Sequence, residues 1–279
     1  MSKVWFITGA GSGIGASAAK AALAAGNRVV ATGRNMQKLR NALGDAAHDN
    51  LALLQLDVSD EAKATTAIEQ AVNRFGGIDV VVNNAGYSLL GNYEELETQD
   101  IQRLFATNFW GVSNVMRAAL PVMRKQRSGH IINISSVAGA VGLMHCGAYS
   151  ASKFAVEGLS LAVAEEVGKF GIKVTVVEPG FFRTDLLDAA NVKWPSTRID
   201  DYAAAEVSAQ EMWSPYAGKQ PGDPEKLGQV LVKLAGMEIP PRMFVAGSDA
   251  IAAVAPAVEA RLKAVYALEE LSTSTDGSF

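Results

Sequence analysis

Tyr149 and Lys153 lie four residues apart at the start of a helical pattern, so both side chains project from one face of that helix. A tyrosine hydroxyl has a pKa of about 10, which is too high for easy proton exchange at neutral pH. A neighbouring ammonium group favours the phenolate and would make Tyr149 a usable general acid or base. The alternative is a surface lysine beside a packed tyrosine. Ser135 and Ser136 end an apolar run shortly before the pair, where a serine can also simply form a turn.

A glycine-rich loop is the second group of residues with the means to do chemistry. Gly9, Gly13 and Gly15 stand in the order Gly-x-x-x-Gly-x-Gly between an apolar run and a helical pattern. Glycines allow the backbone to turn tightly and to approach a pyrophosphate at the N-terminus of the helix, where free N–H groups and the helix dipole attract anions. A strand, a turn and a helix in this order predict a dinucleotide-binding site.

The residues after the second apolar run indicate which nicotinamide cofactor is bound. NAD sites usually carry an Asp or Glu about 20 residues beyond the glycines, whereas NADP sites offer an Arg to the 2′-phosphate. This chain has no carboxylate before Asp45, and Arg34 ends the run with Lys38 one helical turn further on. Because a guanidinium binds a phosphate bidentately, we expect NADP(H) in preference to NAD(H). In the alternative, Arg34 is a solvated loop residue and NAD(H) is used.

Two further turns follow the third and fourth apolar runs. If these runs are strands of one parallel sheet, the turns lie at the same edge of that sheet as the glycine-rich loop. Asp57 and Val58 close the third apolar run, where the aspartate either contacts the adenine or caps a helix that starts near Asp60. Asn83 to Gly86 end the fourth run and bring small residues and amide groups to this edge.

Short apolar runs alternate with longer amphipathic segments along the chain. Most runs are apolar at nearly every position, as expected for a parallel sheet covered on both faces. The seven predicted strands are Val4–Thr8, Arg28–Thr32, Leu51–Leu56, Asp79–Asn83, His130–Ile134, Lys173–Val177 and Met243–Ala246. The helical patterns between them include Gly15–Ala25, Met36–Ala47, Asp60–Phe75, Thr98–Arg127 and Ala148–Phe170. The alternation predicts an α/β protein with one Rossmann-fold domain, in which helices cover both faces of a doubly wound, seven-stranded parallel sheet.

Two segments depart from this alternation. Residues 181–221 hold two tryptophans and three prolines without a clean strand period, and we expect a substrate lid there. An extra helical pair on the surface or at a subunit interface is the alternative. Residues 250–279 form a C-terminal extension, with a helix expected from Ala252 to Leu271 and a polar end beyond it.

Composition limits the classes of function. The chain has 279 residues, of which 49% are hydrophobic, so a large core is expected. Its net charge of −4 disfavours an extended basic surface for nucleic acid. One cysteine, Cys146, allows no intrachain disulfide, and the histidines are too far apart in sequence to suggest a metal site. The apolar runs Val4–Ile7 and Ala250–Val258 are too short for a secretion signal or a membrane span, which predicts a cytoplasmic protein.

Taken together, these residues resemble the short-chain dehydrogenase/reductase family in its compact, single-domain form, of the NADP-preferring carbonyl reductase type. The resemblance covers about residues 3–250. It rests on the ordered motifs Thr8-Gly9-x-x-x-Gly13-Ile14-Gly15, Asp57, Asn83-Asn84-Ala85-Gly86, Asn108, Ser136, Tyr149-x-x-x-Lys153 and Pro179-Gly180.

The resemblance implies a catalytic group of four residues. Tyr149 would protonate the substrate oxygen as hydride arrives from the nicotinamide, and would act as the base in the reverse direction. Lys153 would bond the nicotinamide ribose and lower the pKa of Tyr149. Ser136, preferred over Ser135 because of its spacing from the tyrosine, would hold the carbonyl oxygen. Asn108 would anchor a water that relays protons from the lysine.

The implied cofactor contacts run from the glycine-rich loop to the end of the sixth predicted strand, where Pro179, Gly180 and Thr184 would fix the carboxamide. The full set is Gly9, Ser12, Gly13, Ile14, Gly15, Arg34, Asp57, Val58, Asn84, Ala85, Gly86, Tyr149, Lys153, Pro179, Gly180 and Thr184.

The expected substrate pocket is mainly apolar and aromatic, which favours a hydrophobic ketone or secondary alcohol of moderate size. Many relatives in the family are homodimers or homotetramers, and we expect the same here. The predicted pocket residues are Ser136, Val137, Leu143, Met144, His145, Tyr149, Phe181, Phe182, Trp194 and Trp213.

Three other functions have to be weighed. A sugar-nucleotide epimerase or dehydratase shares the Tyr and Lys pair, but it resembles a longer variant with Gly-x-x-Gly-x-x-Gly spacing and a larger C-terminal domain. A catalytically silent NADP-binding sensor or scaffold typically loses the tyrosine or the lysine, whereas this chain keeps both. An NAD-dependent alcohol dehydrogenase is the alternative within the same reaction class.

Overall fold

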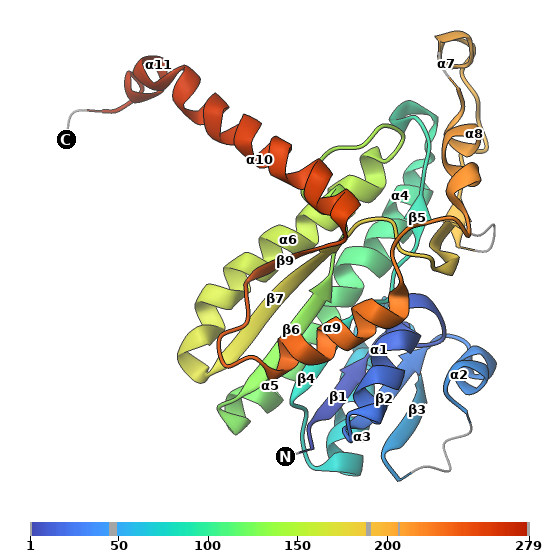
Figure 1. Ribbon diagram of the computed structural model, residues 1–279, viewed down its shortest axis with the longest axis vertical. Helices are drawn as coiled ribbons and strands as arrows, with labels where there is room; N and C mark the ends of the chain where they lie inside the picture. Colours follow the sequence, from blue (N-terminus) through green and yellow to red (C-terminus); the bar gives the residue numbers. More distant parts are fainter. Residues whose placement is uncertain (1, 45–48, 188–190, 206, 278–279) are drawn as a thin grey trace.

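Seven strands form one parallel sheet through the middle of the protein (Figure 1). The computed structural model describes residues 2–44, 49–187, 191–205 and 207–277. Along the sheet the strands follow the order β3-β2-β1-β4-β6-β7-β9, and every neighbouring pair is parallel. Their bounds are β1 Val4–Ile7, β2 Arg28–Gly33, β3 Leu51–Gln55, β4 Val80–Asn83, β6 Gly129–Ile134, β7 Ile172–Pro179 and β9 Met243–Ala246. The predicted fold class is confirmed.

Helices cover both faces of the sheet because successive strand residues point to opposite sides. On one side, Trp5 and Ile7 are buried with residues of α1, α2 and α9, whose bounds are Gly13–Ala24, Met36–Leu43 and Pro224–Gly236. On the other side, Phe6 and Val81 are buried with residues of α3, α5 and α6, whose bounds are Glu61–Phe75, Gly111–Gln126 and Gly147–Val167. Each face therefore has its own hydrophobic core.

The strand order reverses at β1, and this reversal positions the site. β2 and β3 lie on one side of β1, and β4 and the later strands of the sheet lie on its other side. A crevice opens outside the carboxyl ends of the strands at such a point. The residues that follow β1 and β4 are Thr8 and Asn84, at the start of the two predicted cofactor turns.

The single helix predicted over 98–127 is interrupted in the structure. It consists of α4 (Thr98–Phe105), a π-helical turn η2 (Ala106–Trp110) and α5. Asn108 lies within this turn and is fully buried. Its side-chain amide accepts a hydrogen bond from the Tyr87 backbone N–H and donates one to the Tyr87 carbonyl oxygen, both at 3.1 Å. A π-turn inserts an extra residue, which rotates a side chain out of the regular helical spacing, and such turns are frequent at functional sites.

The segment 181–221 contains more regular structure than predicted. It holds the strand β8 (Val192–Lys193), which pairs in parallel with β5 (Ser88–Leu89). It also contains the short helices α7 (Asp200–Ala205) and α8 (Ala209–Trp213), flanked by the 3₁₀ turns η5 (Asp185–Leu187) and η6 (Ser214–Tyr216). A strand of two residues is too short to show a period in the sequence.

The C-terminal extension projects from the body of the protein (Figure 1). It consists of α10 (Ser248–Ala267) and α11 (Glu269–Thr273), so the predicted helix starts earlier than expected and breaks at Leu268. Of the described residues of this extension, Ala250 and Val254 in the first turns are buried against the body. Residues 278–279 of the predicted polar end lie outside the described residues, as do residues 45–47 at the end of the second predicted helix.

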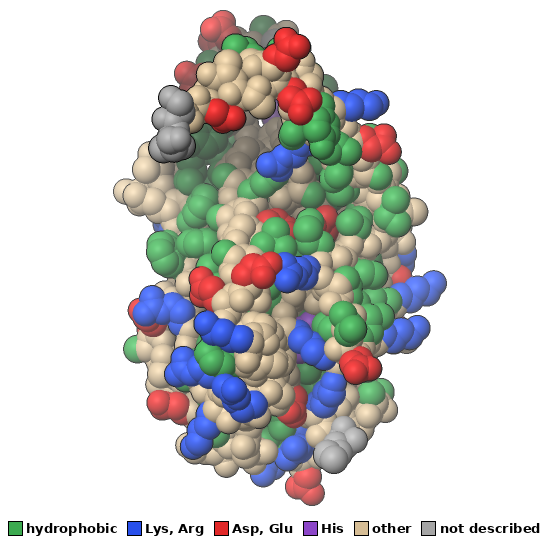
Figure 2. Space-filling view, turned by 90° about the vertical axis from the view of Figure 1, so that its left-hand side faces the viewer, with side chains coloured by type: hydrophobic (Ala, Val, Ile, Leu, Met, Phe, Trp, Pro, Cys, Tyr) green, Lys and Arg blue, Asp and Glu red, His purple; other side chains and the backbone are tan. Residues whose placement is uncertain are grey.

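The surface carries charges of both signs. Figure 2 shows Lys and Arg side chains interspersed with Asp and Glu over the lower half of one face, so this face presents no unbroken positive surface. Within the ranges that the structure describes, no helix is both long and apolar enough to span a membrane.

Gly228 generates a prediction about the packing of α9 on α1. A Cβ at this position would lie 2.5 Å from the carbonyl oxygen of Ser17, so Gly228→Ala must push the helices apart. We expect a loss of about 1–3 kcal/mol in the free energy of unfolding, although alanine itself favours helix. Gly236→Ala in the same helix is the control, because nothing lies within 4 Å of its Cβ position. Urea unfolding of both variants measures this, and equal stabilities would contradict the close approach.

Candidate active site

The glycine-rich loop joins β1 to α1 in a conformation that requires glycine. Gly9 and Gly13 have φ angles of +66° and +53°, in the left-handed region. A Cβ on Gly15 would lie 2.4 Å from the Asn84 amide nitrogen and 2.5 Å from the Gly9 carbonyl oxygen. Ser12 precedes α1 without capping it through its side chain, and the first turn holds no acidic residue. The helix N-terminus therefore keeps N–H groups for an anion.

Thr8 and Asn84 fasten this loop to the turn after β4. The Asn84 side-chain amide donates hydrogen bonds to the carbonyl oxygens of Thr8 (3.0 Å) and Gly9 (3.2 Å). In return, the Thr8 hydroxyl oxygen accepts from the backbone N–H groups of Asn84 (2.9 Å) and Ala85 (3.1 Å). The two predicted cofactor turns are thus one rigid unit, and the anchoring role of Thr8 is a feature that the sequence did not reveal.

A long cleft runs along this unit. At one end it is lined by Arg34, Lys38, Asp57 and Val58, and at the other by Ser136, Tyr149 and Lys153. The two ends share a middle section made of Gly9, Ser12, Ala85, Gly86, Tyr87 and Asn191. Pro179, Gly180 and Thr184 also line the catalytic end, as does Asp185, which the sequence analysis missed.

Asp57 is not the cap of α3. Its carboxylate accepts from the backbone N–H and the hydroxyl of Ser59, at 3.0 Å and 2.7 Å. Asp60 caps the helix instead, by accepting from the backbone N–H of Lys63 at 3.0 Å. The turn at Asp57 therefore shapes the wall of the cleft beside Arg34.

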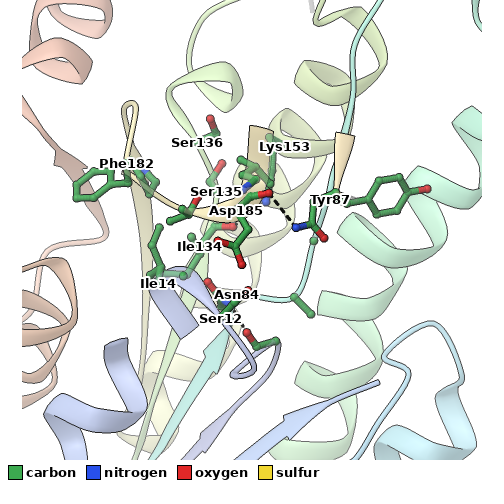
Figure 3. Close-up of a pocket in the computed structure, with 18 of the residues that line it drawn as sticks. Ser12, Ile14, Asn84, Tyr87, Ile134, Ser135, Ser136, Lys153, Phe182 and Asp185 are labelled. Carbon is green, nitrogen blue, oxygen red and sulfur yellow. Dashed lines mark hydrogen bonds between the residues drawn. The ribbon is translucent and has the colours of Figure 1, made fainter. Parts of the chain in front are cut away.

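Lys153 is buried at the carboxyl end of β6. Only 5% of its surface is exposed, and its Nζ donates to the carbonyl oxygen of Ile134 at 2.9 Å. Its Nζ also lies 5.8 Å from the centre of the Tyr149 ring, one helical turn earlier on α6. Figure 3 shows Lys153 together with Ser135 and Ser136 on one side of the cavity, and Ser12, Ile14 and Asn84 below them.

Ser136 and Asn108 lie next to this pair. The Ser136 hydroxyl oxygen accepts from the backbone N–H of Ala138 at 3.1 Å, and Ser136 lines the same stretch of the cleft as Tyr149. Asn108 lies behind the cleft wall, where its amide donates to Ser152 at 3.3 Å. A Cβ on Gly86 would lie 3.1 Å from Asn108 Oδ1 and 3.7 Å from Lys153 Nζ. The structure therefore brings the four predicted catalytic residues together.

Burial changes the proton affinities of the pair in opposite directions. It raises the pKa of Tyr149 to about 12, although the hydrogen bond with Ser136 opposes this. It lowers the pKa of Lys153 to about 8, and the nearby carboxylate of Glu157 partly offsets this. The lowered pKa expected for Tyr149 is therefore not seen in the protein by itself, because desolvation of the phenolate is the largest influence on this pKa. At neutral pH the phenol keeps its proton.

Two buried carboxyl groups lie behind Lys153, and the sequence analysis did not identify them. Glu157 follows one turn later on α6 and Glu178 lies near the end of β7; they are 7% and 0% exposed. A Cβ on Gly139 would lie 2.4 Å from the Ser135 hydroxyl oxygen and 3.1 Å from Glu157 Oε1, so glycine there leaves room for both. Burial raises the pKa of Glu157 to about 7 and also raises that of Glu178.

An apolar cavity adjoins the end of the cleft that holds Ser136 and Tyr149. Seven predicted pocket residues line it, namely Ser136, Val137, Leu143, Tyr149, Phe181, Phe182 and Trp213. The wall also includes residues that the sequence analysis missed, namely Ser88, Leu90, Leu186, Leu187 and Gln220. Phe181, Trp213 and Tyr216 form an aromatic group at this wall, with ring centres 5.6–6.1 Å apart.

Three predicted pocket residues lie outside the cavity lining. Met144 occupies a turn that faces solvent and is 58% exposed. His145 has a φ of +60° and its ring Nδ1 lies 2.9 Å from Asn92 Oδ1, which directs it to the neighbouring loop. Trp194 packs behind the cavity wall, against a cluster that includes Val192 and the wall residues Leu90 and Trp213, and does not itself line the cavity. Cys146 lines the cavity, and burial raises the pKa of its thiol to about 12. The described residues hold no group of three or more metal-ligating side chains.

Comparison with known proteins identifies the family. The model of the family described as short chain dehydrogenase matches residues 3–194. The chain belongs to this family. It is 36% identical to the oxidoreductase BOA17 of Botryotinia fuckeliana, over 93% of this chain and 94% of that protein.

Two solved structures share this fold. The structure of a short-chain dehydrogenase from Streptomyces avermitilis has a TM-score of 0.89 and 34% identity, and the match covers 99% of both chains. ElxO with NADP bound has a TM-score of 0.72 and 30% identity, covering 88% of this chain and 97% of that one. The protein is therefore an oxidoreductase of this family with a Rossmann-like fold.

The raised pKa of Glu157 predicts a pH-dependent contribution to stability. Its folded-state pKa of about 7 exceeds the ordinary value of 4.5, so its favourable contribution is complete below pH 4.5 and is lost as the pH rises through 7. We expect Glu157→Gln to gain stability relative to the wild type between pH 5 and 8, by up to ~3 kcal/mol.

Denaturant unfolding across this pH range measures the effect. Glu166→Gln is the control, because Glu166 lies on the same helix and is exposed. The control should follow the wild type at every pH. A Glu157→Gln curve parallel to the wild type would mean that Glu157 ionises normally in the folded protein.

Proposed function

We propose that the protein is an NADP(H)-dependent carbonyl reductase that reduces hydrophobic ketones and, in reverse, oxidises secondary alcohols. The observation that carries this proposal is the junction of two cavities. The polar cleft and the apolar cavity meet at Ser136 and Tyr149, which line both. A group bound in the cleft and an apolar molecule bound in the cavity would face each other across a hydroxyl that can donate a proton.

The cleft has features that suit a dinucleotide phosphate. The glycine-rich loop keeps the N-terminus of α1 open, and a side chain at Gly15 would collide with Asn84 and Gly9. Arg34 and Lys38 line the far end, which supports a 2′-phosphate there. ElxO, a family member of 30% identity, was solved with NADP bound. When bound, NADPH would supply the hydride.

The residues of the chain would supply the remaining chemistry. Tyr149 would donate its hydroxyl proton to the carbonyl oxygen; burial keeps this phenol protonated at neutral pH by raising its pKa. Ser136 would hold the same oxygen by a hydrogen bond. The Lys153 ammonium would stabilise the phenolate that forms and would bond the ribose, with Asn108 anchoring a water for proton return. An apolar cavity excludes water and strengthens each of these interactions.

The proposal also covers the substrate lid, the extent of the domain, the oligomeric state and the location of the protein. Residues 181–221 would act as the substrate lid, since Phe181 and Trp213 contribute to the cavity wall. The domain would extend over 1–279 as one unit, and the working form would be a homodimer or homotetramer in the cytoplasm. A catalytically silent cofactor sensor is the principal rival, and turnover distinguishes it.

The first prediction from this proposal concerns turnover. We expect purified protein to consume NADPH with a hydrophobic ketone, as measured by absorbance near 340 nm. Tyr149→Phe lacks only the hydroxyl and should reduce kcat at least ~100-fold, because the general acid is lost. NADPH binding by the variant, followed by fluorescence, should stay within threefold of the wild type. Tight NADPH binding with no turnover of ketones or alcohols would support the sensor.

The second prediction concerns the choice of cofactor. Arg34→Leu removes the guanidinium expected to bind the 2′-phosphate, and we expect the Kd for NADPH to rise at least ~10-fold. The Kd for NADH is the internal control, because this cofactor lacks the phosphate, and it should change by less than threefold. Equal effects on both cofactors would indicate that Arg34 shapes the cleft without recognising the phosphate.

A further inference from the structure

We propose that Gln220 recognises a hydroxyl group on the substrate, so that the preferred substrates are hydrophobic hydroxyketones and the corresponding diols. This inference rests on the proposed reductase function and adds a specificity-determining residue to it. Gln220 lines the apolar cavity with Ser136 and Tyr149, yet it stands outside every motif that carries the chemistry.

The side-chain amide oxygen of Gln220 is buried without a hydrogen-bond partner. The residue is 2% exposed, and its Oε1 is a buried acceptor that no group of the described protein satisfies. Leaving a buried amide oxygen unpaired costs about 1–3 kcal/mol, so native proteins rarely tolerate it without a reason. Because Oε1 belongs to a residue in the cavity wall, a bound molecule with a donor would remove this penalty.

Trp213 adds a second unpaired group to the same wall. Its ring packs against Phe181, but its Nε1–H is buried and has no acceptor. An indole N–H only donates, whereas the Gln220 Oε1 only accepts. A hydroxyl is the small group that suits both, since it donates one hydrogen bond and accepts others. A ketone oxygen only accepts, so it leaves Oε1 unpaired, and an ammonium only donates, so it leaves the indole N–H unpaired.

The backbone around Gln220 holds this side chain in place. Gly222 N–H donates to the Phe181 carbonyl oxygen at 2.9 Å, and Arg183 N–H donates to the Gly222 carbonyl oxygen at 2.8 Å. A Cβ on Gly222 would lie 2.7 Å from the Phe182 ring, so this close pairing requires glycine. The segment 220–222 is thereby fixed to the residues that follow β7. A preorganised polar group discriminates between substrates more strongly than a mobile one.

The rest of the cavity explains why a single hydroxyl would matter. Most of its remaining wall is apolar, with Leu90, Val137, Leu143 and Leu187 among the lining residues. A substrate hydroxyl that met only these side chains would lose its hydrogen bonds to water. Next to Gln220 the hydroxyl can again donate a hydrogen bond, whereas a plain ketone of the same size leaves the Gln220 amide oxygen unpaired.

The experiment compares matched substrates. Wild-type protein is assayed with NADPH on a plain hydrophobic ketone, on the same ketone bearing a hydroxyl at successive carbons, and on the amino analogue. We expect one hydroxyketone to exceed the plain ketone in kcat/KM by about 10- to 100-fold, which corresponds to one buried hydrogen bond. The amino analogue should not show this preference.

Gln220→Met keeps the length of the side chain and removes its polar atoms. In this variant we expect the preference to fall below about threefold, with a lower kcat/KM for the hydroxyketone and a higher one for the plain ketone. Trp213→Phe, which removes the N–H but keeps an aromatic ring, should lose part of the preference. Gln210→Met is the control, because Gln210 is exposed on α8, and it should retain the full preference.

The outcomes separate this inference from the proposed function. Reduction of the plain ketone without any preference for a hydroxyl would overturn the role of Gln220 and leave the reductase intact. The same holds if Gln220→Met keeps the full preference, or if the amino analogue is preferred. Absence of turnover on every carbonyl would instead reject the reductase itself. NADPH binding and circular dichroism establish that each variant is folded.

Discussion

The buried ammonium of Lys153 is the group on which the rest of the site depends. A charge removed from water costs several kcal/mol unless nearby groups compensate for it. Here the compensation comes from the Ile134 carbonyl oxygen at 2.9 Å and from Glu157 one turn along α6. Because Ile134 is the last residue of β6, this bond ties α6, which carries Tyr149 and Lys153, to the sheet edge. Tyr149 on α6 and Ser136 after β6 are consequently held next to each other, where the cleft meets the apolar cavity.

The same charge explains why polar groups accumulate in an otherwise apolar layer. Glu157, Glu178 and Ser135 are all buried near the ends of β6 and β7, where the hydrophobic cores of the two faces end. A carboxyl group there is tolerated because it can hold a proton or offset the lysine. Glu157 interacts with both Lys153 and Glu178, whereas the pKa of Glu178 is raised by burial.

Most of the fold and the catalytic group could be predicted from the sequence because both depend on local patterns. The seven runs gave the seven strands, and the ends of parallel strands meet at one edge, so Ser136, Tyr149 and Lys153 were expected to converge. The π-turn at Asn108 was not expected, since it depends on hydrogen bonds with Tyr87, about twenty residues earlier.

The lining of the apolar cavity was predicted less accurately, because its residues are brought together from distant parts of the sequence. Met144 and His145 were expected in the pocket from their place near Tyr149, yet the φ of +60° at His145 turns the chain toward Asn92. Gln220 instead reaches the cavity through backbone pairing between 220–222 and the residues after β7, separated by about forty positions. A polar residue between Lys219 and Pro221 has no periodicity that would indicate burial.

This division between local and distant contacts has a functional consequence. The groups proposed for the chemistry lie on β6 and α6 and in the turns at the sheet edge, where the parallel ladder sets their positions. The aromatic and polar wall of the cavity comes largely from the segment after β7, which is joined to the sheet edge by a few backbone bonds. Substitutions in that segment can alter the shape and polarity of the wall while the strand ends stay in place. Selectivity can therefore change independently of the reaction, because the two depend on different parts of the fold.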